Sequence, residues 1–365
     1  MSEPSGFVTI DEAMIIPEGV KEDLEWDLVR THLDRMVEYN GNSTPAQGVR
    51  ELHIELTHRC NLKCVMCEHW EMEHLDPGSV KREMDLAKIK ALVSGSRTLD
   101  GVTGVAVTGG EPWLRADFVD IVGLLCERFP AASVIVLSNF WNTGHIRLKL
   151  NELKARGARL RLGSSLDGLE RTHDAVRGEK GAFAGLVATA RMLKADFPEI
   201  PYGFTFTMTP HNAHELYDTY LFVREELGCA LGAQWVIDRP GVAPMAWTPE
   251  TRDEGLRQIR KVLQDLCRRH DAARRIVSPE RKEHAWLWSE LLYWRYLEEY
   301  GRELKRFSFF KKCLAGERHV MLDPEGSVFY CPVNKDRPIG NALDTPLDKL
   351  WSSPKAEEER RFVES

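Results

Sequence analysis

The stretch LHIELTHRCNLKCVMC, residues 52–67, decides the fold of this chain. Its first half is a short apolar run of strand length, so the cysteines that follow lie on a loop just past a strand end. Three residues separate Cys60 from Cys64 and two separate Cys64 from Cys67, and three thiols so close together cannot all pair as disulfides. They can bind a 4Fe–4S cluster, which normally takes four thiolates, and leave one iron open to a small molecule.

Short apolar strands alternate with amphipathic helices from Glu51 onward. Strands are predicted at 51–57, 102–107, 132–138, 159–165, 202–208 and 231–237. Helices are predicted near 86–98, 116–128, 145–156, 183–195 and 213–226, with Asp85 as the N-cap of the first. Strands and helices that alternate at this length are typical of right-handed βαβ units, which build a parallel sheet.

The cysteine spacing and this alternation resemble the radical S-adenosylmethionine (SAM) superfamily, over essentially residues 51–351. The resemblance implies an α/β fold with a partial (β/α)6 TIM barrel, in which Cys60, Cys64 and Cys67 bind one 4Fe–4S cluster. It also implies that the open iron chelates SAM and that an electron donor such as flavodoxin or ferredoxin reduces the cluster. The reduced cluster then cleaves SAM to methionine and a 5′-deoxyadenosyl radical, which takes a hydrogen atom from the substrate.

One position departs from the family pattern, because Met66 stands where an aromatic residue usually packs near the adenine. The alternative of another class is a non-enzymatic Fe–S or zinc-binding module. In that case the further matches to the family would be coincidence.

The resemblance assigns SAM binding to residues at the strand tips. The run Thr108-Gly109-Gly110-Glu111-Pro112 matches the family's Gly-Gly-Glu-Pro motif, and two glycines let a backbone approach a ligand closely. A plain strand-to-helix turn opened by Pro112 is the alternative. The other candidates for SAM contacts are Asn139, Ser165, Asp167 and Arg177. Turn or helix-cap roles are the alternative for the first three, and a surface salt bridge for Arg177.

The tips of the fifth and sixth strands are expected to face the substrate, since active sites of α/β barrels lie at the carboxyl ends of the strands. His211 and Asp238 are the catalytic candidates there, because each could bind a polar group or move a proton. A cap position at the start of a helix is the alternative for His211.

The chain divides into four predicted segments. Residues 1–48 form an N-terminal helical preamble and residues 49–240 the core barrel. Residues 241–312 form a helical bridging region, whose aromatic-rich second helix is expected to pack across the open side of the barrel. Residues 313–365 form a small α+β extension.

The extension resembles the start of a SPASM or twitch module, which binds auxiliary Fe–S clusters. Cys313, Gly326 and Cys331 match its opening pattern, and the turn Asp323-Pro324-Glu325-Gly326 predicts a hairpin between the cysteines. The later cysteines of the module are missing, so a second cluster at Cys313 and Cys331 is not favoured.

Bulk composition narrows the function class. A net charge of −7 without a basic block argues against nucleic-acid binding. The polar N-terminus carries no signal-peptide pattern, and no apolar run reaches membrane-spanning length. The 8 cysteines are spaced unlike a disulfide scaffold, which favours the reducing cytoplasm.

Two substrate classes compete. A preamble of about fifty residues is short for a separate peptide-recognition domain, which favours a small polar metabolite such as a sugar, an aminocyclitol or a nucleoside derivative. The expected outcome is then oxidation, epimerisation or decarboxylation. A ribosomal peptide or protein is the alternative substrate.

Overall fold

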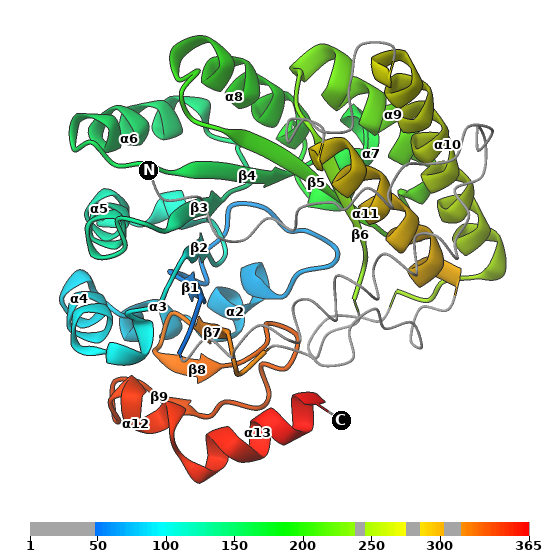
Figure 1. Cartoon of the computed structure of the whole chain (residues 1–365). Helices are drawn as coiled ribbons and strands as arrows, with labels where there is room; N and C mark the ends of the chain where they lie inside the picture. Colours follow the sequence, from blue (N-terminus) through cyan, green and yellow to red (C-terminus); the bar gives the residue numbers. More distant parts are fainter. Residues whose placement is uncertain (1–47, 238–244, 275–284, 303–314, 365) are drawn as a thin grey trace. The chain divides into compact units, whose positions relative to one another are not determined.

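The computed structural model of the chain describes residues 48–237, 245–274, 285–302 and 315–364 (Figure 1). The predicted preamble helix, Asp238 and Cys313 lie outside the described residues. The chain forms two compact units, of which the larger comprises residues 46–212, 218–246 and 312–365. The smaller unit contains residues 213–217 and 247–311.

The larger unit is built on a parallel sheet that confirms all six predicted strands. Each strand pairs in parallel with the next in chain order. This order is that of the predicted partial (β/α)6 barrel. The strands are β1 (Glu51–Glu55), β2 (Gly104–Thr108), β3 (Ser133–Leu137), β4 (Arg161–Ser165), β5 (Tyr202–Met208) and β6 (Leu231–Trp235).

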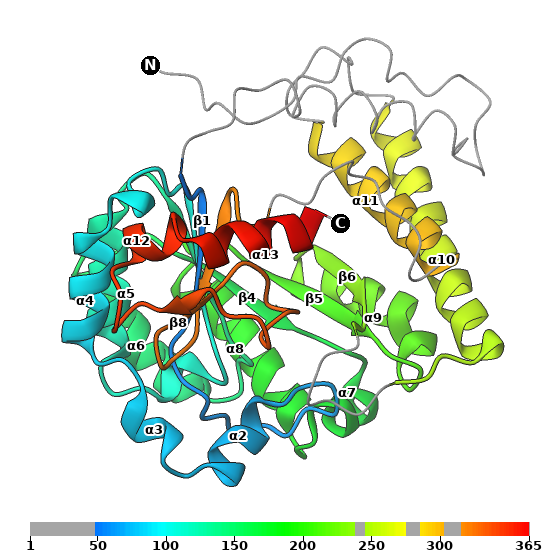
Figure 2. The same ribbon diagram turned by 90° about the horizontal axis from the view of Figure 1, so that it is seen from below.

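Helices follow the strands and lie on the outer side of the curved sheet (Figures 1 and 2). They include α4 (Leu86–Gly95), α5 (Phe118–Arg128), α6 (Thr143–Ala155) and α8 (Ala182–Asp196). Asp85 caps α4 as predicted, since its side chain accepts a hydrogen bond from the Lys88 N–H. The apolar faces of strand and helix are buried: Ile54 of β1 and Ile121 of α5 are both 0% exposed. Burying one such side chain contributes about 1.5–3 kcal/mol to folding.

The predicted helix over 213–226 is not continuous. A short 3-10 turn, η4 (Ala213–Glu215), precedes α9 (Leu216–Phe222), and the last turn widens into a π-helix, η5 (Val223–Leu227). Gly228 ends it in the left-handed conformation, with φ +72. A glycine is favoured there because other residues rarely adopt that backbone conformation.

The C-terminal segment continues the same sheet. The predicted hairpin is present as β7 (His319–Leu322) and β8 (Ser327–Phe329), which pair antiparallel. The sequence did not predict that β7 pairs in parallel with β1 and so extends the barrel sheet, with β9 (Gly340–Asn341) at the far edge. Two helices follow, α12 (Leu347–Trp351) and α13 (Pro354–Glu364). Asp348 of α12 accepts hydrogen bonds from Ser96 and Thr98.

The smaller unit contains two helices that pack against each other, α10 (Pro249–Arg274) and α11 (Ala285–Arg302). Glu298 of α11 is fully buried, and its carboxylate lies 2.7 Å from Arg260 of α10 and 2.8 Å from Arg302. Trp294 is fully buried as well, so this aromatic-rich helix packs within its own unit, and its predicted packing across the barrel stays a prediction. None of the described helices combines the length and the apolar character that a membrane span requires.

Candidate functional site

The three cysteines lie on one loop, residues 56–68, between β1 and α2 (His69–Leu75). Cys64 is 8% exposed, while Cys60 and Cys67 are half-buried, and all three are free thiols. Leu62, Ala182 and Trp141 pack against them in one apolar cluster. The loop therefore holds the three cysteines together within one partly buried apolar cluster.

The end of α7 (Glu170–Arg177) supports the middle of this loop. The N–H groups of Lys63 and Val65 donate to the carbonyls of Arg177 and Val176, each at 3.0 Å. Gly178 ends the helix with φ +67, and a Cβ at that position would lie 2.2 Å from the Lys63 carbonyl oxygen. In this segment the sequence named Arg177 by resemblance only, but a glycine after a basic residue is also a helix C-terminus signal.

The Gly109-Gly110 turn supports the start of the loop. The Gly110 N–H donates to the Thr57 carbonyl and the Glu111 N–H to the Arg59 carbonyl, both at 2.7 Å. A Cβ on Gly110 would lie 2.2 Å from the Arg59 carbonyl oxygen. The two glycines therefore allow a close approach of the cysteine-loop backbone, whereas the predicted approach to SAM stays a prediction.

Glu111 joins the tips of β2 and β3. It is 3% exposed, and its carboxylate accepts hydrogen bonds from the N–H groups of Asn139, at 2.7 Å, and Trp113, at 3.4 Å. Pro112 opens the short 3-10 helix that follows. Burial raises the pKa of Glu111 to about 7, because a charged carboxylate loses its hydration there.

Replacing Glu111 with glutamine is expected to change how stability depends on pH. The folded pKa of about 7 exceeds the ordinary value of 4.5, so the unfolded chain releases this proton first as the pH rises. The free energy of unfolding of the wild type therefore decreases as the pH rises from 4.5 to about 7, by at most about 1.4 kcal/mol per pH unit. In urea unfolding, the free energy of unfolding of Glu111→Gln relative to the wild type should be about 2.5 kcal/mol higher at pH 8 than at pH 5.

The control for this experiment is Glu152→Gln, because Glu152 is exposed on α6. Its stability should follow the wild type at both pH values. Parallel pH profiles for wild type and Glu111→Gln would show that Glu111 is already ionised in the folded chain at pH 5.

Asn139 also contacts the cysteine loop. Its side-chain N–H donates to the Asn61 side-chain oxygen at 2.7 Å, and its own side-chain oxygen accepts from the Trp141 N–H at 3.0 Å. Asn61 was not among the sequence candidates, although it directly follows Cys60. The pair ties the tip of β3 to the loop.

Asp167 and Arg177 form a buried ion pair beside Cys64. Asp167 is 0% exposed and the Arg177 side chain 12% exposed, so the predicted alternative of a surface salt bridge is wrong. The second Asp167 oxygen accepts from the Thr207 N–H at 2.7 Å, and Arg177 Nη1 lies 3.5 Å from Cys64 Sγ. Burial raises the pKa of Asp167, while Arg177 opposes that shift. Ser165 is half-buried at the end of β4.

The two catalytic candidates are not brought to the loop by described contacts. The His211 side chain is exposed, and its backbone N–H donates to the Thr209 hydroxyl at 3.3 Å. Asp238 lies outside the described residues. The sequence missed Asn212, which is 0% exposed and donates to the Asp167 carbonyl at 3.1 Å. A buried amide next to an exposed histidine gives no periodic signal from which it could be found.

These residues fit a cluster held by three thiolates. Burial raises the pKa of the Cys60 thiol to about 12, so it stays protonated until a metal binds, and a coordinating thiol is deprotonated outright. The guanidinium beside Cys64 would offset negative charge on such a cluster. Fold and loop together define an α/β barrel with three cysteines gathered at the carboxyl end of its first strand, an arrangement that fits an Fe–S cluster.

Comparison with known families gives the same class. Residues 54–223 match the Radical SAM superfamily, and residues 313–365 match SPASM, an iron-sulfur cluster-binding domain. The chain therefore carries a radical SAM domain, which implies a 4Fe–4S cluster and SAM.

Two curated relatives each match over 82% of this chain. The antilisterial bacteriocin subtilosin biosynthesis protein AlbA of Bacillus subtilis is 25% identical over 308 residues. The PqqA peptide cyclase of Gluconobacter oxydans is 27% identical over 315 residues. The chain spans only 59% of the length of the first relative and 76% of the second.

Solved structures share the fold. The anSMEcpe structure with bound AdoMet has a TM-score of 0.60 at 17% identity, over 86% of this chain and 80% of that one. Streptococcus suis SuiB has a TM-score of 0.59 at 16% identity, over 95% of this chain and 76% of that one.

Proposed function

We propose that this chain is a radical SAM enzyme that modifies a peptide. The observation that supports this most is the extent of the matches to AlbA and to the PqqA peptide cyclase, 82% of this chain in each case. The first name refers to the biosynthesis of a bacteriocin and the second to a peptide that is cyclised. The fold neighbours include SuiB bound to its precursor peptide SuiA, at a TM-score of 0.56.

Relatives named for small molecules match a shorter part of the chain. The GTP 3′,8-cyclase of Synechococcus elongatus is 32% identical over 177 residues, which is 48% of this chain. That length is close to the Radical SAM match alone, residues 54–223. The matches that extend further are those with peptide names, so the comparisons favour the peptide over the small polar metabolite expected from the short preamble.

In the proposed mechanism, Cys60, Cys64 and Cys67 hold the cluster and leave one iron for SAM. A cluster bound there would supply the one-electron reduction of SAM that starts hydrogen-atom abstraction from the substrate. Arg177 places positive charge beside Cys64 and is itself held by Asp167. Glu111 and Asn139 fix the tips of β2 and β3 against the loop.

We assign SAM contacts to the strand tips named by the sequence. Ser165 is the best placed of them, since the side chains of Asn139 and Asp167 already bond to this chain. A one-electron donor such as flavodoxin or ferredoxin would reduce the cluster.

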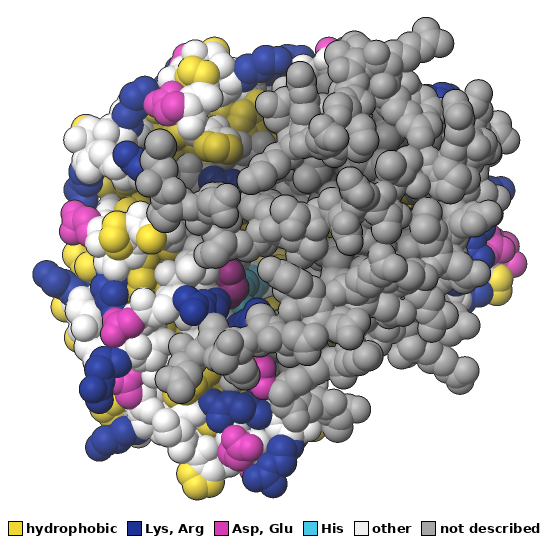
Figure 3. Space-filling view, in the orientation of Figure 1, with side chains coloured by type: hydrophobic (Ala, Val, Ile, Leu, Met, Phe, Trp, Pro, Cys, Tyr) yellow, Lys and Arg dark blue, Asp and Glu magenta, His cyan; other side chains and the backbone are white. Residues whose placement is uncertain are grey.

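On the face drawn in Figure 3, the positively charged Lys and Arg side chains of the described residues are mixed with the negatively charged Asp and Glu side chains.

A second cluster stays an open prediction. The SPASM match begins at residue 313, and Cys331 is half-buried and accepts a contact from the Val333 N–H at 3.5 Å. Two thiolates alone hold a cubane poorly. Iron analysis of reconstituted protein decides this point, because one cluster gives about four irons per chain and two give about eight.

The substrate class is tested with the reconstituted, anaerobic protein, SAM and dithionite. The probes are synthetic peptides encoded by short reading frames next to the gene, and a matched panel of sugars, aminocyclitols and nucleosides. A peptide is expected to raise 5′-deoxyadenosine formation above the substrate-free rate and to show a mass change. Stimulation by a small metabolite alone, with every peptide unchanged in mass, would overturn the peptide proposal and leave SAM cleavage intact.

A further inference from the structure

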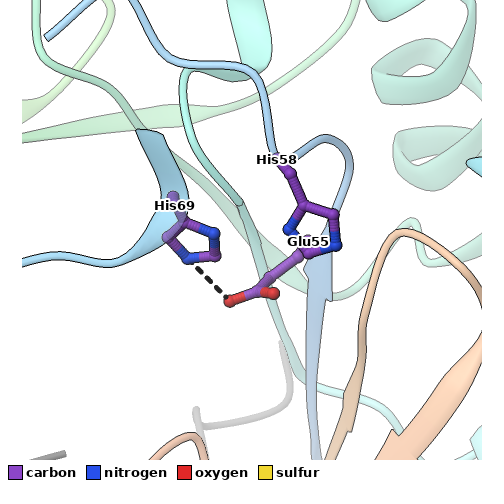
Figure 4. A group of neighbouring side chains, drawn as sticks. All are labelled: Glu55, His58 and His69. Atoms are coloured by element: carbon purple, nitrogen blue, oxygen red, sulfur yellow. Dashed lines mark ion pairs between the residues drawn. The ribbon is translucent and has the colours of Figure 1, made fainter. Parts of the chain in front are cut away.

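Three metal-binding side chains lie together outside the cysteine set. Glu55 ends β1, His58 lies on the loop just after it, and His69 begins α2 (Figure 4). They are 4%, 4% and 7% exposed, respectively. One ligand atom from each residue lies within 4.8 Å of the other two. We refer to these residues as the His–Glu group.

The spacing within the group is close to that of a zinc site. His69 Nε2 lies 3.3 Å from Glu55 Oε1. A tetrahedral zinc ion with bonds of about 2.0–2.1 Å places neighbouring ligand atoms about 3.3 Å apart. Two imidazoles and one carboxylate, with a fourth position open, are a set of ligands that zinc takes.

The histidines also carry buried polar atoms that lack partners. His58 Nδ1 and His69 Nδ1 are buried, and neither has a hydrogen-bond partner among the described residues. The two rings stack, with centroids 5.7 Å apart. A buried polar atom without a partner costs about 1–3 kcal/mol. His69 faces Glu55 with Nε2, so its Nδ1 is not the atom that would bind an ion, and His58 Nδ1 is the unpartnered nitrogen that an ion could satisfy.

The place of the group in the chain suggests that purpose. His58 precedes Cys60 by two residues, and His69 follows Cys67 by two residues. The two histidines therefore flank the three cysteines, and their rings stack at the point where the two ends of this run meet, which is the base of the loop. An ion bound by both of them would close the loop, and closing a loop lowers the entropy of the segment it encloses.

We propose that Glu55, His58 and His69 bind one Zn²⁺ ion, which closes the base of the cysteine loop. The ion is separate from the Fe–S cluster, because its ligands are nitrogen and oxygen atoms rather than thiolates. The inference does not depend on whether the substrate is a peptide.

Lys335 is the competing cation. Its ammonium donates to both Glu55 oxygens, at 2.7 and 2.8 Å, and its side chain is 22% exposed. Zinc must displace this ammonium from at least one oxygen, and the partly exposed side chain can turn toward water. Removing the ammonium should therefore tighten zinc binding, whereas a purely structural Glu55–Lys335 pair would give no such gain.

The test is zinc binding by the cluster-loaded, full-length protein. The protein is dialysed against buffered Zn²⁺, and zinc and iron per chain are measured while iron stays constant. Wild type is expected to bind one zinc ion that His69→Ala binds about tenfold more weakly or worse. His74→Ala is the matched control, since His74 is exposed on the same helix and should leave zinc affinity unchanged.

Lys335→Met provides a second, independent test of zinc binding, because it keeps all three proposed zinc ligands. It is expected to bind zinc about tenfold more tightly than wild type. Equal zinc affinity in wild type and His69→Ala would overturn the proposal. So would a Lys335→Met protein that binds zinc no more tightly than wild type, even if His69→Ala failed to fold.

Discussion

Replacing Cys64 with alanine is expected to abolish cluster assembly and SAM cleavage while the barrel still folds. Cys64 is the most buried of the three thiols and the one that Arg177 contacts, at 3.5 Å. Two remaining thiolates hold a cubane poorly, so the iron and sulfide content should fall by one cluster, which is about four irons and four sulfides per chain. The measurements are iron and sulfide analysis, and 5′-deoxyadenosine formation in the presence of SAM and dithionite.

The matched control is Cys126→Ala. Cys126 is a half-buried thiol on α5, and its sulfur contacts the Arg159 carbonyl at 3.5 Å. This variant should assemble the cluster and cleave SAM as wild type does. Undiminished SAM cleavage by Cys64→Ala would contradict the assignment of the cysteine loop.

Replacing Gly110 with alanine is the second change with a large expected effect. The new Cβ would lie 2.2 Å from the Arg59 carbonyl oxygen and 2.8 Å from the His58 carbonyl oxygen. Neither atom is the end of a flexible side chain, so the backbone just before Cys60 must move. Overpacking of this kind costs about 1–3 kcal/mol or more, and the shift is transmitted directly to a cluster ligand.

Gly110→Ala is therefore expected to lose most of its cluster and its SAM affinity, and a valine there should lose more. Iron content and equilibrium SAM binding of the reconstituted protein are the measurements. Gly144→Ala is the control, because nothing lies within 4 Å of a Cβ at that position on α6. If Gly110→Ala binds iron and SAM like wild type, the turn does not support the loop as described.

Local patterns predicted the elements that depend on local chemistry. The six strands, the cap at Asp85 and the hairpin over 319–329 follow from apolar runs, a capping side chain and a turn sequence. The helix over 213–226 was predicted as one piece, and its widened last turn has no separate periodic signal. The comparisons bear out the radical SAM class that the cysteine spacing predicted.

The features of the fold and the site that the sequence did not predict depend on contacts between distant segments. The pairing of β1 with β7 joins residues more than two hundred positions apart, and an apolar run does not name its partner. The sequence likewise placed Arg177 at the site but could not decide between a buried and a surface ion pair. The burial of Asp167 beneath Arg177 depends on tertiary packing, as does the bond between Asn139 and Asn61.

The central claim is that this chain uses its cysteine loop to cleave SAM by one-electron reduction. The most direct test is product analysis after anaerobic incubation of reconstituted wild-type protein with SAM and dithionite. The account predicts methionine and 5′-deoxyadenosine in equal amounts, formed only when both cluster and reductant are present. Intact SAM under these conditions, from protein that carries a full complement of iron and sulfide, would contradict it.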